Sequence, residues 1–80
     1  MSESFITKDK YLRTIQPAID LAISRNKKYG NTVDIVRTSS IIDLILMKLM
    51  RTRKLSTTDD KYLDELYDSL NYLVYILMRQ

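Results

Sequence analysis

The chain has 80 residues and a formal net charge of +3, a mild bias that favours anionic partners but falls short of a nucleic-acid-binding arm. This length allows one domain, over 1–80, and because 45 % of the residues are hydrophobic we expect its small core to be completed by homo-oligomerisation. Cysteine and histidine are absent, which excludes disulfides, thiolate metal sites and the usual general base near neutral pH, and leaves Mg²⁺ on carboxylates as the metal to consider.

The first predicted element is helical. One glycine and one proline in 80 residues predict an all-α fold, a small bundle of three main helices. Residues 1–6 are expected to be loose, and Thr7 can cap the first helical stretch. Pro17 either begins a second helix at its first turn or kinks a longer one. The stretch ends near Tyr29, because its basic last turn precedes Gly30, the expected left-handed stop.

A connection and a second helix follow. Residues 31–40 are polar and β-branched, although 32–36 alternate and can form a brief extended piece. Ser40, with Asp43 three residues later, resembles a capping box, so the helix should cover about 40–54. Its wide apolar surface consists of Ile41, Ile42, Ile45, Leu46 and Leu49.

The third helix begins after a polar turn, where Thr57 is placed to cap it, and runs to about Met78. At 100° per residue its leucines share one stripe, flanked by Tyr67 and Val74, that we expect to face the core. These leucines are Leu63, Leu66, Leu70, Leu73 and Leu77.

The opposite side of this helix is polar. Asp64, Asp68, Asn71 and Tyr75 fall on it, because offsets of four, seven and eleven residues return to one helical face. A plain solvated surface would carry lysines and glutamates here, whereas tyrosines fill this side. The pattern is typical of a face that meets a ligand or another subunit.

Two cations on the second helix are candidate partners. Lys48 and Arg51 emerge among apolar residues, either as an anion site or as interhelical ion-pair partners of Asp64 and Asp68. Both interpretations predict that these four residues lie near each other. Arg25, Lys27 and Lys28 crowd the end of the first helical region, where the helix dipole alone favours cations.

Three ordered motifs carry a family resemblance. They are "KKYGNT" with Lys28, Tyr29 and Gly30; "KLMR" with Lys48 and Arg51; and "DELYDSLNY" with Asp64, Asp68, Asn71 and Tyr72. Over about residues 25–76 the chain resembles the nucleotide-modification-associated domain family of phages and bacteria, itself similar to the MazG-like all-α nucleoside triphosphate pyrophosphohydrolases. The resemblance implies a helical bundle that associates as a dimer or larger oligomer and binds a nucleotide among its helices.

An enzymatic role is the first interpretation of this resemblance. Glu65 and Asp68 match one Glu-x-x-Asp half of the MazG-type metal signature, and a Mg-dependent pyrophosphohydrolase would use Asp64, Glu65 and Asp68 in catalysis, with Asp64 and Asp68 as metal ligands. The other half departs from the family pattern, because the preceding helix offers only Asp43. Two carboxylates without a second pair make a poor Mg²⁺ cradle.

Binding without turnover is the interpretation we favour, and it needs no cofactor. Here Lys28, Lys48 and Arg51 would clamp phosphates, Asp68 and Asn71 would hydrogen-bond a ribose or base, and Tyr29, Tyr72 or Tyr75 would stack on the base. By family-level analogy, a phage protein of this kind, in the host cytoplasm, could act against host defence by sequestering a nucleotide signal.

Two further classes compete with nucleotide binding. In one, the chain is a helical oligomerisation or adaptor module without a small ligand. In the other it binds DNA, which we disfavour because its basic residues are dispersed over two helix ends: Lys27, Lys28, Arg51, Arg53 and Lys54. No apolar run of about 18 to 20 residues could span a bilayer and no signal-peptide core begins the chain, so we expect a cytoplasmic protein without a membrane partner.

Overall fold

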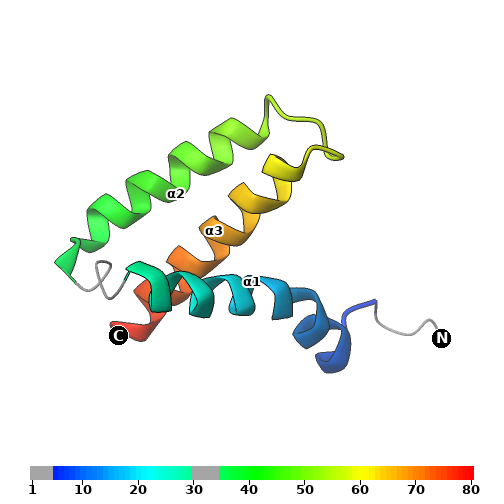
Figure 1. The fold of residues 1–80 in the computed structure, drawn as a ribbon, viewed down its shortest axis with the longest axis horizontal. Helices are drawn as coiled ribbons and strands as arrows, with labels where there is room; N and C mark the ends of the chain where they lie inside the picture. The colour runs from blue at the N-terminus through cyan, green and yellow to red at the C-terminus, as the bar shows by residue number, and fades with distance from the viewer. Residues whose placement is uncertain (1–4, 30–34) are drawn as a thin grey trace.

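A computed structural model describes residues 5–29 and 35–80, and contains no strand in that part of the chain. Three helices follow in order: α1 (Lys8–Tyr29), α2 (Thr38–Thr52) and α3 (Asp60–Met78) (Figure 1). The predicted all-α fold of three main helices is confirmed. Our expectations for residues 1–6, Gly30 and the extended piece at 32–36 fall wholly or largely outside the described residues. Within these residues no helix is long and apolar enough to cross a membrane.

One continuous helix, α1, decides between the two alternatives left open at Pro17, in favour of a longer helix with the proline inside it. The backbone N–H of Lys10 donates to Thr7 Oγ1 at 3.1 Å, so Thr7 caps the helix as predicted. Pro17 lies inside the helix, where it removes one backbone hydrogen bond and crowds the carbonyl four residues earlier. Figure 1 shows the first turns of α1, in blue, turning away from the line of the later turns.

The starts of α2 and α3 differ from the predicted caps. α2 begins two residues before Ser40, and its N-cap, Arg37, makes no side-chain cap hydrogen bond, so the predicted capping box was wrong. The N-cap of α3 is Asp59, whose carboxylate accepts from Lys61 N at 2.9 Å, rather than Thr57. Asp59 directly precedes the helix and carries a charge that the helix dipole favours, so it outcompetes the hydroxyl. The predicted end at Met78 is confirmed.

α2 and α3 form an antiparallel pair, and α1 packs across α3 (Figure 1). The core between them is very small: among the described residues the buried apolar side chains are Ala18, Ile41 and Ile45. The buried polar residue is Ser69, whose hydroxyl donates to Glu65 O at 2.8 Å. The described part of one chain therefore buries only a few of its many apolar side chains.

Only part of the predicted core stripe of α3 is covered within a single chain, where Leu66 and Leu70 are half-buried. Leu63, Leu73 and Leu77 are exposed, and the buried side is the one that carries Glu65 and Ser69. The physical reason is that α3 has two helical neighbours, and both are tied to its polar side by ion pairs and hydrogen bonds. Periodicity locates an apolar stripe, but it does not say whether the stripe faces the same chain or another one.

Candidate functional site

Lys48 of α2 is the centre of an ion-pair network that joins the helices. Its Nζ lies 3.1 Å from Asp68 Oδ2 and 3.9 Å from Glu65 Oε2, both on α3. The three side chains are only 13–17 % exposed, so water screens their charges less than those of a surface pair. Lys48 lies there because it follows Ile45 by three residues, on the inner face of α2.

Two arginines complete this network. Arg51 Nη1 lies 3.6 Å from Glu65 Oε1, and Arg25 of α1 donates from Nη1 to Asp68 Oδ1. Both arginines are partly open to solvent, with 45 % of the Arg25 side chain and 56 % of the Arg51 side chain exposed. We call these five residues, Arg25, Lys48, Arg51, Glu65 and Asp68, the charged cluster. Its three cations exceed its two carboxylates, so the cluster carries one net positive charge.

The cluster leaves one polar atom unsatisfied. Glu65 Oε2 is buried and has no hydrogen-bond partner among the described residues, since the nearest cation, Lys48 Nζ, is 3.9 Å away, beyond hydrogen-bond reach. An unpaired buried oxygen is costly and marks a place where the polar network is incomplete.

Two tyrosines border the charged cluster on α3. Lys48 Nζ lies 5.8 Å from the centre of the Tyr72 ring, within cation–π range. Tyr72 and Tyr75 meet edge to face, with ring centres 6.0 Å apart and planes at 75°. Burial raises the pKa of Tyr75, with the nearby Tyr72 and Asp68 adding to the rise and Arg25 opposing it. Its hydroxyl is therefore neutral and can donate a hydrogen bond.

The structure brings together Lys48, Arg51, Asp68 and Tyr72, as the sequence predicted, but it excludes Asp64. The Asp64 side chain is exposed and makes no ion pair with a described residue. The expectation that Asp64 lies with the two cations was wrong, because one residue further on a helix is a rotation of 100°, and Glu65 takes the inward position.

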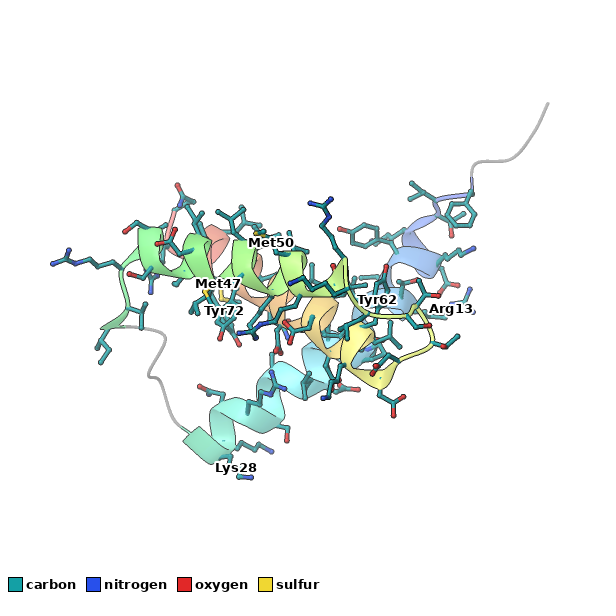
Figure 2. All side chains as sticks on the ribbon, turned by 90° about the horizontal axis from the view of Figure 1, so that it is seen from above. Arg13, Lys28, Met47, Met50, Tyr62 and Tyr72 are labelled. Atoms are coloured by element: carbon teal, nitrogen blue, oxygen red, sulfur yellow. The ribbon has the colours of Figure 1, made fainter. Side chains whose placement is uncertain are left out.

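The remaining predicted ligands lie elsewhere or have a structural partner. Asn71 Nδ2 donates to Ala18 O at 2.9 Å and so ties α3 to α1. Lys28 lies at the end of α1, well apart from Tyr72 in Figure 2. Tyr29 is the last residue of α1, and its side chain lies outside the described part of the structure.

The pairing of Arg25 with Asp68 was not predicted from the sequence. Its only signal was a basic residue near the end of the first helix, and the two residues are 43 positions apart. Nothing local in the sequence predicts such a pair, because it depends on the angle at which α1 crosses α3.

The donor set does not fit Mg²⁺. Among the described residues no three acidic side chains gather to hold a metal ion. Asp68 already contacts two cations, and Asp64, its predicted co-ligand, is exposed and outside the cluster. A divalent ion placed here would meet lysine and arginine where it needs further oxygens.

The sequence matches the model of a known protein family. The model of the family described as "Nucleotide modification associated domain 1" matches residues 25–79, a range that begins at Arg25 and includes the whole charged cluster. Searches of curated proteins and of solved structures find no match. Because the family model covers more than half of the chain, the chain belongs to the nucleotide modification associated domain 1 family.

Proposed function

We propose that the chain binds a nucleotide, or a signal derived from one, at the charged cluster and does not turn it over. The observation that carries this proposal is the excess of cations over carboxylates where α1, α2 and α3 meet, with two arginines partly open to solvent. A phosphate-bearing ligand complements such a site. The description of the family, which names nucleotide modification, supports the same class of ligand.

Each part of the cluster has a distinct role in this proposal. Arg51 and Arg25 present planar guanidinium groups that can grip phosphate oxygens through two hydrogen bonds. Lys48 adds a half-buried point charge. Asp68 and Glu65 hold the cations in place between the helices, and Tyr72 offers a ring for base stacking.

The MazG-like hydrolase remains the competing proposal. Its chemistry needs several carboxylate oxygens around Mg²⁺ to stabilise a departing pyrophosphate. In this chain α2 offers only Asp43, which is exposed, while Lys48 and Arg51 lie opposite Glu65. This arrangement favours holding a phosphate over cutting it. By family analogy, such a protein would sequester its ligand, as a phage protein could do with a defence nucleotide.

Thermal melts against nucleoside triphosphates and cyclic dinucleotides, with and without Mg²⁺, test the proposal. A ligand at 100 times its dissociation constant adds about 2.7 kcal/mol to the free energy of unfolding, which is readily seen as a shift in Tm. Arg51→Ala should weaken binding at least tenfold, since one charge-assisted hydrogen bond contributes about 1.5 to 3 kcal/mol. The matched control is Arg53→Ala, since Arg53 follows the last residue of α2 and makes no ion pair with the charged cluster among the described residues.

Three results would count against the proposal. If no nucleotide raises Tm, the cluster is an interhelical tie only, as in an adaptor module. If Arg51→Ala and Arg53→Ala weaken binding equally, the ligand lies elsewhere. If Mg²⁺-dependent release of pyrophosphate occurs and is lost in Asp68→Asn, the hydrolase is correct and binding without turnover is wrong.

A further inference from the structure

Four side chains form a row along one side of α3, which we call the α3 row: Lys61, Glu65, Asp68 and Tyr72. Steps of four, three and four residues return to the same side of a helix, and the two middle members belong to the charged cluster. At a rise of about 1.5 Å per residue, the row is about 16 Å long. Its two ends differ in chemistry, because Lys61 is a cation and Tyr72 is aromatic.

One side of α2 runs along this row. Met47 and Arg51 are one helical turn apart and so lie on the same side of α2, and Arg51 Nη1 lies 3.6 Å from Glu65 Oε1. Because α2 and α3 are antiparallel (Figure 1), residues that precede Arg51 lie opposite residues that follow Glu65. Figure 2 shows Met47 beside Tyr72. The thioether of Met47 and the ring of Tyr72 therefore border the same end of the row.

We propose that the ligand lies lengthwise on the α3 row, with its phosphates at Lys61 and Arg51 and its base between Tyr72 and Met47. This inference rests on the proposed function, and it assigns two binding residues that the charged cluster does not include, Met47 and Lys61. It also assigns the class of ligand, a nucleoside with a linear chain of two or more phosphates. A cyclic dinucleotide has a base on either side of its phosphates, whereas the α3 row has an aromatic ring at one end only.

Lys61 extends the series of cations beyond the charged cluster. Its side chain is exposed and makes no ion pair with a described residue, although Glu65 follows it by one helical turn. Glu65 is paired with Arg51 and Lys48 instead. An anion can therefore bind Lys61 without breaking an ion pair among the described residues, which makes this end of the row suited to the last phosphate of a chain.

Met47 is suited to contact a base. Its side chain is 51 % exposed, so a ligand can reach it. Methionine is flexible and polarisable, and its sulfur makes favourable contacts with aromatic rings. Tyr72 offers the opposing ring surface, with Lys48 Nζ 5.8 Å from its centre.

Calorimetric titration of the full chain tests the proposal with three probes: nucleoside triphosphates, nucleoside monophosphates and inorganic tripolyphosphate. Met47→Ala should weaken the binding of a triphosphate nucleotide about fivefold and leave tripolyphosphate binding unchanged, because only the nucleotide has a base. Lys61→Ala should weaken both about fivefold at low salt. The matched controls are Met50→Ala, on the opposite side of α2 in Figure 2, and Lys54→Ala, an exposed cation beyond the end of α2. All four side chains are exposed, so helical circular dichroism should be retained.

The outcomes separate this inference from the proposed function. If no nucleotide binds the wild type, the proposed function fails, and the inference fails with it. If a nucleotide binds but Met47→Ala behaves like Met50→Ala, or Lys61→Ala like Lys54→Ala, the nucleotide site stands and only its orientation on the α3 row is overturned. A cyclic dinucleotide or a monophosphate that binds more tightly than every triphosphate also overturns the inference alone.

Discussion

Replacement of Lys48 by methionine tests whether the charged cluster holds the helices together. Methionine has a similar length and keeps the apolar stem, but it removes the ammonium group that lies 3.1 Å from Asp68 Oδ2 and 3.9 Å from Glu65 Oε2. The two carboxylates then lose the cation between them. We expect the free energy of unfolding to fall.

The size of the loss follows from burial. Removing one partner of a buried ion pair costs about 3 to 5 kcal/mol, because the other charge is left uncompensated. Here each carboxylate keeps one arginine, Arg25 at Asp68 and Arg51 at Glu65, so we expect a smaller loss of about 2 kcal/mol. For a domain of this size that corresponds to a fall in Tm of roughly 8 to 16 °C.

Urea unfolding followed by circular dichroism measures this loss, with all variants at one protein concentration because self-association would add to stability. A cycle with Asp68→Asn should give a coupling energy of about 1 to 2 kcal/mol. Arg13→Ala is the control, since Arg13 pairs with Asp9 at 2.9 Å on the exposed surface of α1, away from Tyr72 in Figure 2. Such a pair contributes about 0.3 to 0.5 kcal/mol. If Lys48→Met costs no more than this control, the reasoning is refuted.

Three further predictions concern docking, capping and pH. Asn71→Ala should destabilise by about 1 to 2 kcal/mol and speed hydrogen exchange in α1, because it removes the amide that docks α1 on α3, whereas the exposed Asp64→Asn should do neither. Asp59→Ala should cost about 1 kcal/mol and Thr57→Ala almost nothing, and equal losses in urea unfolding would contradict the assignment of the cap. The raised pKa of Tyr75 predicts a contribution to stability that is intact below pH 10 and lost as the pH rises through the folded-state pKa, since the folded state then binds more protons than the unfolded state. Tyr75→Phe should therefore lose less stability above pH 10 than the wild type, and identical alkaline melting curves would show that this tyrosine makes no such contribution.

Local chemistry explains why the helices were predictable. The scarcity of glycine and proline, the cap at Thr7 and the end of α3 at Met78 all depend on neighbouring residues, which the sequence displays directly. Pro17 was ambiguous because the same residue suits a helix start and a bent helix interior. The cap of α3 was predicted at the wrong residue because two polar residues, Thr57 and Asp59, compete for this role within a few positions.

The charged cluster was predictable only in part, since it depends on tertiary geometry. Spacing placed Lys48 and Asp68 as partners, and the structure brings them within 3.1 Å. Choosing between Asp64 and Glu65 as the partner of the α2 cations requires knowing how α3 is rotated about its axis. That rotation is set by the neighbouring helices. Predicting that Arg25 pairs with Asp68 requires knowing how α1 crosses α3, because the two residues come from distant parts of the chain.

The orientation of α3 turns two carboxylates, Glu65 and Asp68, inward and leaves three leucines, Leu63, Leu73 and Leu77, exposed. A helix with two neighbours on adjoining sides leaves the rest of its circumference uncovered, and here both neighbours carry cations, Arg25 and Lys48, that pair with Asp68. If α3 were rotated about its axis to bury these leucines, Asp68 would be separated from Arg25 and Lys48. Each buried ion left without a partner would cost several kcal/mol. The ion pairs thus set the orientation of α3, and that orientation accounts for the exposure of Leu63, Leu73 and Leu77.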